Sequence, residues 1–139
     1  MALAVAVGAG ACAGGPEQAK PVSEVEPTVA TPVREVTRVV DQLERSVAAS
    51  DYGSICSELL SSVARRRAGG GGCARRLRSA AGNVEAPAIE LARITLGGDR
   101  ATAEVVVTAR GEAPALEELS LVREAGRFRI LALRVPLGS

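Results

Sequence analysis

The first strong periodic pattern lies just after residue 32. Apolar side chains recur there at steps of three and four, which is the spacing of one face of a helix. These positions are Val33, Val36, Val40, Leu43 and Val47. Because proline suits the first helical position, Thr31 and Pro32 predict the start of a helix that ends near residue 49.

Two further helices are predicted between residues 50 and 83. Ser50 or Asp51 can cap the second helix, which ends at three consecutive arginines before a run of four glycines. Its apolar face consists of Tyr52, Ile55, Cys56, Leu59, Leu60 and Val63. A short third helix begins at Cys73 and stops at Gly82 and Asn83.

The pattern changes to alternation after Asn83. We expect strands over residues 89–96, 101–110, 119–123 and 128–135, with tight turns at 97–100 and 124–127. Helices followed by an antiparallel meander predict an α+β domain, because parallel βαβ units would alternate helices with strands.

The chain before residue 33 has a different character. Residues 1–11 are apolar or small throughout, and this run has the length of a signal-peptide core rather than of a membrane-spanning helix. Residues 12–32 are rich in proline, with glycine, serine, threonine and glutamate, and show no periodicity. We therefore predict a signal peptide (1–11), a disordered linker (12–32) and a folded domain (33–139).

Small residues stand immediately before Cys12, in the order Ala9-Gly10-Ala11. They resemble the bacterial lipobox, which implies cleavage before Cys12 and acylation of its thiol. Ala9 stands where leucine is usual, and the basic residues that normally open a signal peptide are missing. The expected product is an exported lipoprotein held at the cell membrane, facing outside the cytoplasm. The alternatives are a secretory signal without lipid, or a cytoplasmic chain with a chance cysteine.

Composition excludes several classes of chemistry. The chain has no histidine, so histidine-dependent catalysis and histidine-bound metals are excluded. Its 17 basic and 16 acidic residues give a net charge of +1, and its only aromatic residues are one tyrosine and one phenylalanine. This balance argues against nucleic-acid binding, which needs basic surfaces and stacking platforms. We expect no cofactor.

The order of elements resembles the nuclear transport factor 2-like (SnoaL-like) superfamily, in particular small secreted or lipid-anchored members from high-GC bacteria. The resemblance covers residues 33–136. The segments that carry it are Asp51, Ile55-Cys56-Ser57-Glu58-Leu59-Leu60, Cys73, Gly98-Asp99-Arg100-Ala101 and 121–130. Phe128 stands where relatives often have tryptophan. The resemblance implies N-terminal helices packed on a curved antiparallel sheet, a cone with a cavity, and a homodimer formed through the open sheet face.

Cys56 and Cys73 remain once Cys12 is assigned to the lipid. The leader and the resemblance together favour a disulfide between them in an oxidising compartment. Two buried thiols acting as small apolar residues are the alternative. Two thiols without histidine do not complete a zinc site, so no metal is expected.

Arginines gather on both sides of the glycine run without an acidic residue among them. Those named as a candidate anion-binding site are Arg65, Arg66, Arg67, Arg75 and Arg76. The alternative is a solvated loop with arginines at helix ends, because helical spacing scatters these residues over several faces.

Two functions from different classes follow. The preferred hypothesis is a non-enzymatic envelope module that binds a small apolar ligand or a protein partner. The alternative is a small-molecule isomerase or hydrolase that uses Glu90 or Glu104 as a cavity base. No catalytic residue is assigned, because Tyr52 is expected to pack in the core and the sequence leaves the faces of both strands open. The side on which the two glutamates lie discriminates between the hypotheses.

Overall fold

The computed structural model describes residues 27–134 of the 139-residue chain. The predicted signal peptide, Cys12 and most of the linker lie outside this range. Helices come first and an antiparallel sheet follows, so the predicted α+β class is confirmed. The helical elements are α1 (Pro27–Ala48), α2 (Tyr52–Ser54), the π-helical turn η3 (Ile55–Leu59), α3 (Ser62–Arg67), the 3-10 turn η4 (Gly70–Gly72) and α4 (Cys73–Ala81). The strands are β1 (Ala88–Gly97), β2 (Arg100–Thr108), β3 (Ala115–Glu124) and β4 (Arg127–Arg134).

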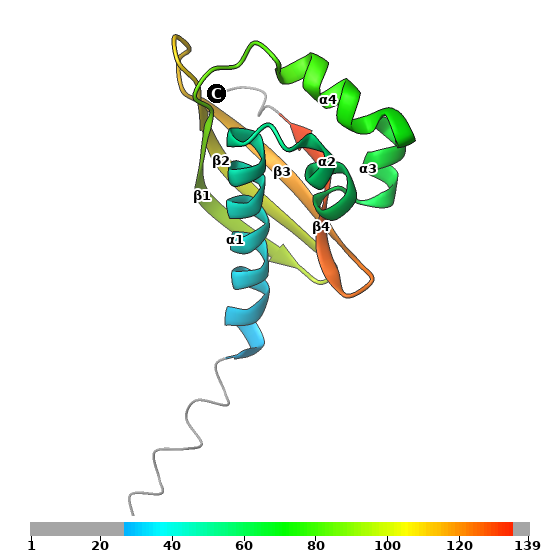
Figure 1. Ribbon diagram of the computed structural model, residues 1–139. Helices are drawn as coiled ribbons and strands as arrows, with labels where there is room; N and C mark the ends of the chain where they lie inside the picture. Colours follow the sequence, from blue (N-terminus) through cyan, green and yellow to red (C-terminus); the bar gives the residue numbers. More distant parts are fainter. Residues whose placement is uncertain (1–26, 135–139) are drawn as a thin grey trace, which may run out of the picture.

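Helix α1 lies along the concave side of the curved sheet (Figure 1). Val36 and Val40 from the predicted apolar stripe are buried against the strands, as expected. The predicted start at Pro32 is wrong, because α1 already begins at Pro27 and holds Pro32 in its interior. Pro27 occupies the first helical position, where no backbone donor is needed, and the internal Pro32 removes one helical hydrogen bond.

The predicted second helix is interrupted at Leu60. Asp51 caps its start as expected, since its carboxylate accepts a hydrogen bond from the Ser54 amide at 3.2 Å. Leu60, however, is extended and forms a parallel bridge with Ile130 of β4. The Ser61 amide donates to the Ile130 carbonyl at 2.9 Å, and the Ser61 hydroxyl then caps α3 by accepting from the Ala64 amide at 3.1 Å. Pairing with a distant strand thus outweighs the local helical pattern.

The four strands form one sheet in the order β1-β2-β3-β4, with every neighbouring pair antiparallel. Gly98 and Gly126 occupy the two tight turns with φ of 61° and 78°, a conformation that other residues adopt only at a cost. The register shifts between Leu91 and Arg93 in β1, and again between Ser120 and Leu121 in β3. Such bulges increase the local twist and help the sheet to curve around α1.

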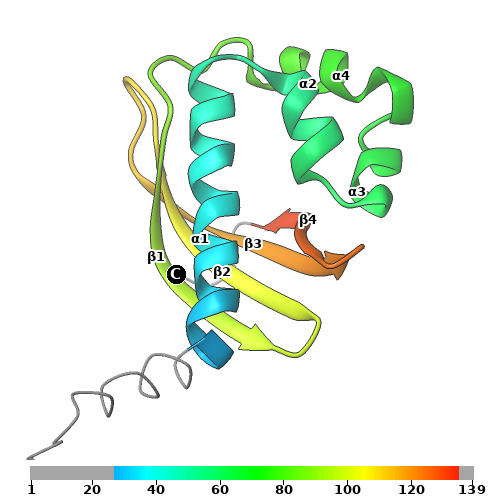
Figure 2. The ribbon, with the colours of Figure 1, turned by 60° about the horizontal axis from the view of Figure 1, so that its bottom comes forward.

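The helices all lie on one face of the sheet, as Figure 2 shows from a second direction. The inner positions of β2 and β3 are the buried ones, and the core draws on α1, α2, η3 and the last three strands. Its buried members are Val36, Val40, Tyr52, Ile55, Leu59, Ala101, Ala103, Val105, Leu119, Leu121, Phe128 and Ile130. The core is therefore aliphatic, and the Arg123 guanidinium covers its one phenylalanine, Phe128, at 4.3 Å.

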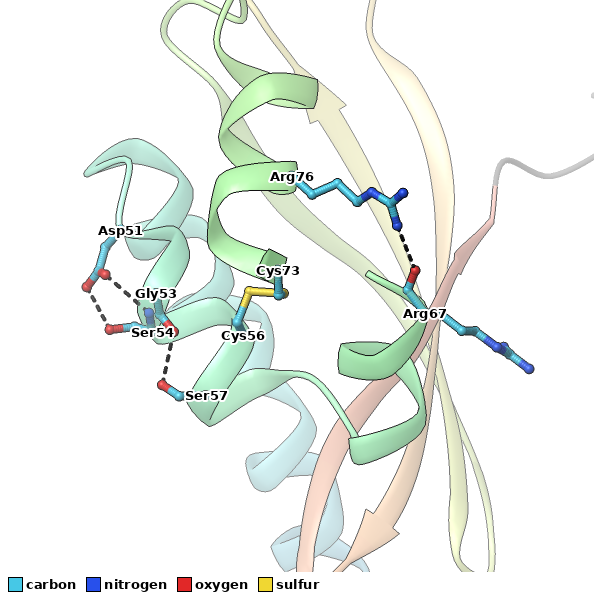
Figure 3. Close-up of a disulfide and its surroundings, with 8 residues drawn as sticks. All are labelled: Asp51, Gly53, Ser54, Cys56, Ser57, Arg67, Cys73 and Arg76. Carbon is cyan, nitrogen blue, oxygen red and sulfur yellow. Dashed lines mark hydrogen bonds between the residues drawn. A yellow bond between two sulfur atoms is a disulfide. The ribbon is translucent and has the colours of Figure 1, made fainter. Parts of the chain in front are cut away.

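The predicted disulfide between Cys56 and Cys73 is confirmed (Figure 3). It joins η3 to the first residue of α4, and both cysteines are buried. The bond closes a loop with a sequence separation of 17 residues. In the chain-entropy model a loop of this size contributes about 3 kcal/mol to stability, which supports a region with few buried side chains of its own.

None of the helices within residues 27–134 is long and apolar enough to cross a bilayer.

Candidate functional site

A cavity of about 1100 Å³, which is partly open to solvent, lies between the helices and the inner face of the sheet. Its walls come from the end of α1, from the segment between α2 and α4, and from all four strands. Aliphatic side chains dominate the walls, among them Leu43, Val47, Leu60, Leu77, Ile89, Val107, Leu119 and Ile130. The volume slightly exceeds the usual range of small-molecule sites, which are mostly apolar with a few placed polar groups.

Among the described residues, three charged ones line this cavity: Arg67, Arg78 and Glu117. The Arg78 guanidinium lies 5.8 Å from the centre of the Tyr52 ring, and Tyr52 lines the cavity as well. Tyr52 is only 6% exposed and belongs to the buried core, in agreement with its expected packing role. The cavity therefore combines a large aliphatic surface with a few charges at defined positions.

Sequence analysis missed Glu117. It pairs with Val105 of β2, whose side chain is buried on the inner face, so the alternation along β3 places Glu117 on the same face. Strand β3 begins at Ala115, four positions before the first residue of the predicted strand, so Glu117 was not assigned to a strand. Extending the period-two pattern backwards from Leu121 and Leu119 would have found it.

The two glutamates proposed as catalytic bases do not line the cavity. Their neighbours Leu91 and Val105 occupy the inner face, so Glu90 and Glu104 lie on the outer one. Glu104 forms an ion pair there with Arg93 at 3.3 Å, and Glu90 is exposed. The isomerase or hydrolase hypothesis thereby loses both of its named residues.

The five arginines of the candidate anion site occupy different environments. Only Arg67 lines the cavity. Arg76 donates from its guanidinium to the Arg67 carbonyl at 3.3 Å, which satisfies the end of α3 and ties it to α4 (Figure 3). Arg66 and Arg75 are exposed and line neither this cavity nor the second pocket, and Arg65 lies close enough to Glu124 to act on its charge. Arg78, which was not among the five, is the second arginine in the cavity wall.

Within residues 27–134, two carboxyl groups have shifted pKa values, and both stabilise the fold. The hydroxyl and amide of Ser54 hydrogen-bond to Asp51 and lower its pKa. Glu124 accepts from the Ser62 amide at 3.1 Å and from its hydroxyl at 3.0 Å. The hydrogen bond from the Ser62 backbone amide is the main cause of the lowered pKa of Glu124. Neither group lines the cavity, and each accepts a hydrogen bond at the start of a helix. These pKa shifts therefore reflect helix capping rather than catalysis.

A second, smaller pocket of about 510 Å³ lies among α1, η3 and β4. Most of its polar side chains form ion pairs or hydrogen bonds with other residues of the domain. Glu35 forms an ion pair with Arg123 at 3.1 Å, and the Gln42 amide donates to Glu58 at 2.8 Å. Arg129 donates to the backbone carbonyls of η3. These contacts fasten α1 and η3 to the edge of the sheet.

Residues 27–134 contain no group of three or more acidic or cysteine side chains arranged to hold a metal ion. Comparison of the chain with protein-family models and with curated proteins finds no match. The resemblance to the nuclear transport factor 2-like superfamily therefore stays a prediction from sequence, and the cavity itself is the basis for a functional proposal.

Proposed function

We propose that this protein is a non-enzymatic module of the cell envelope that holds a small apolar ligand between its helices and its sheet. The observation that carries the proposal is the cavity of about 1100 Å³ with aliphatic walls. Transfer of apolar ligand surface from water into such a site is favourable at about 25 cal/mol per Å². The order of helices before a curved meander supports membership of the nuclear transport factor 2-like superfamily.

Binding of a neutral, apolar fluorophore such as N-phenyl-1-naphthylamine tests the cavity. Ala81 lines it, so Ala81→Phe places a ring in the space and should weaken binding about tenfold. Ala113→Phe is the matched control, because Ala113 is exposed in the segment between β2 and β3 and does not line the cavity. Thermal unfolding of both variants verifies the fold. Equal binding by wild type and Ala81→Phe would contradict the proposed site.

The proposed location is the outer side of the cell membrane, with a lipid on Cys12. The Cys56–Cys73 disulfide supports export, because disulfides persist in oxidising compartments and are rare in the cytosol. Cys12→Ser should abolish incorporation of labelled palmitate and release the protein from the membrane fraction, whereas Cys56→Ser should leave labelling intact. Palmitate labelling that persists in Cys12→Ser would contradict the proposed lipid anchor at Cys12.

A second candidate function is catalysis by a cavity carboxylate. Glu117 favours it, since this carboxyl lines the same cavity as Tyr52. Against it stands the lack of a second acidic side chain in the cavity wall contributed by residues 27–134, which leaves one carboxylate without a partner acid. The substitution Glu117→Gln decides between the two functions. A binding module keeps its affinity for the neutral fluorophore, whereas an enzyme that uses this carboxylate loses its catalytic activity.

A further inference from the structure

The charges of the cavity are divided between its two walls. Both arginines, Arg67 and Arg78, come from the hairpin formed by α3 and α4, whereas the glutamate, Glu117, comes from the sheet. Part of the apolar cavity is therefore bordered by positive charge. Both arginines are exposed to solvent at the border of the cavity, where each can form a charge-assisted hydrogen bond with an anion whose apolar part lies against the aliphatic wall.

The arginine-bearing wall is held in place by contacts that a ligand does not have to form. The Tyr52 ring supports the Arg78 guanidinium, and the Cys56–Cys73 disulfide fixes the start of α4. The hydrogen bond from Arg76 to the Arg67 carbonyl fixes the end of α3 against α4. A hairpin restrained in this way lowers the entropic cost of ordering the arginines when a ligand binds.

The remaining lining indicates the shape of the ligand. Tyr52 is the only aromatic side chain among the lining residues, and Leu43, Val47, Leu77 and Leu119 provide aliphatic surface. A flat ring system gains from stacking on aromatic faces, which this cavity nearly lacks. A flexible hydrocarbon chain needs only aliphatic surface and volume, and the cavity offers both.

We propose that the ligand is a long-chain amphiphile with an anionic headgroup, either a carboxylate or a phosphate monoester. The headgroup lies at Arg67 and Arg78, and the chain extends along the aliphatic walls. Glu117 on the sheet repels an anion and so favours the hairpin as the place for the headgroup. This inference rests on the proposed ligand-binding function and adds the chemical class of the ligand.

The test uses four probes with one 16-carbon chain: hexadecanoate, hexadecyl phosphate, hexadecanol and hexadecylamine. Each competes with the neutral fluorophore for wild-type protein at pH 7, at a concentration at which the probe is dissolved as a monomer. We expect at least one anionic probe to bind about tenfold more tightly than the alcohol, as one charge-assisted contact allows. The tighter of the two anions identifies the headgroup.

Other outcomes separate this inference from the function on which it rests. Equal affinities for all four probes, or tightest binding by the amine, would overturn the anionic headgroup and leave the apolar site intact. Failure of every probe and of the fluorophore to bind would overturn both.

Matched charge variants test the position of the headgroup. The double variant Arg67→Gln with Arg78→Gln should lose about tenfold in affinity for the tighter anion and keep its affinity for hexadecanol. The control is Arg66→Gln with Arg75→Gln, which removes the same charge from the same two helices at exposed positions outside the cavity. An equal loss in both double variants would assign the effect to diffuse surface charge and overturn the site. Retained hexadecanol binding shows that a variant is folded. The comparison of the four probes on wild-type protein tests the anionic headgroup independently of these variants.

Discussion

The sheet and the α3–α4 hairpin are held together in different ways. Leu121 in the middle of β3 is completely buried, and the inner positions of β2 and β3 form a continuous packed layer. In α3 and α4 the only buried residue is Cys73. The sheet is thus stabilised by packing, whereas the hairpin depends on a disulfide and a few hydrogen bonds.

This difference explains where the cavity lies. Arginines make up much of α3 and α4, and their side chains are rarely buried without partners, so the hairpin cannot pack closely over the sheet. The Cys56–Cys73 bond ties the start of α4 to η3 (Figure 3), and the cavity lies between this hairpin and the sheet. The packed sheet provides stability, and the disulfide-linked hairpin leaves room for a ligand.

The largest effect is expected from a substitution in the packed half. Leu121→Ala removes a fully buried side chain away from the cavity and should lower the free energy of unfolding by about 4 kcal/mol. Urea denaturation followed by circular dichroism measures the loss. A cost below about 1 kcal/mol would show that the sheet is less well packed than its burial implies.

Removal of the disulfide should have the next largest effect. Cys56→Ser with Cys73→Ser is expected to cost about 3 kcal/mol, and hydrogen exchange should rise first in residues 52–81 while the sheet stays protected. Reductant should reproduce the loss in the wild type and change nothing in the double variant. Uniformly faster exchange over helices and strands would contradict separate stabilisation of the two halves.

A smaller loss is expected from Leu77→Ala in α4. Leu77 is only partly buried and already borders empty space, so truncation removes fewer contacts than at Leu121. We expect a cost of about 1 kcal/mol in the same denaturation assay. A cost as large as that of Leu121→Ala would mean that α4 packs as tightly as the sheet, and the contrast between the halves would disappear.

The smallest effect is expected from the side-chain contact between Glu124 of the sheet and Ser62 at the start of α3. Because the pKa of Glu124 is lower in the folded state than in the unfolded chain, its contribution is complete above the unfolded value. It is lost as the pH falls through the lower, folded value. Glu124→Gln should therefore reduce the fall in the urea midpoint below about pH 4.

Glu112→Gln is the control for this pH dependence, since Glu112 is exposed in the segment between β2 and β3. Identical pH profiles for wild type and Glu124→Gln would show that the carboxylate does not fasten α3 to the sheet.

Local signals predicted much of this architecture because their causes are local. The 3.6-residue stripe of Val36 and Val40 and the alternation of Ala101, Ala103 and Val105 each depend on neighbours in sequence. The tight turns at Gly98 and Gly126 follow from the freedom of glycine to adopt positive φ. The disulfide was favoured over two free thiols by the predicted leader and by the family resemblance, and the structure contains it.

The sequence by itself therefore determined the α+β class, the apolar face of α1 and the tight turns, and it favoured the disulfide. Tertiary structure decided the break at Leu60, because only pairing with Ile130 makes an extended residue favourable there. It also placed Glu90 and Glu104 outside and Arg78 and Glu117 in the cavity wall. These positions depend on strand register and on how far the hairpin stands from the sheet, and both are set by contacts between residues far apart in the chain.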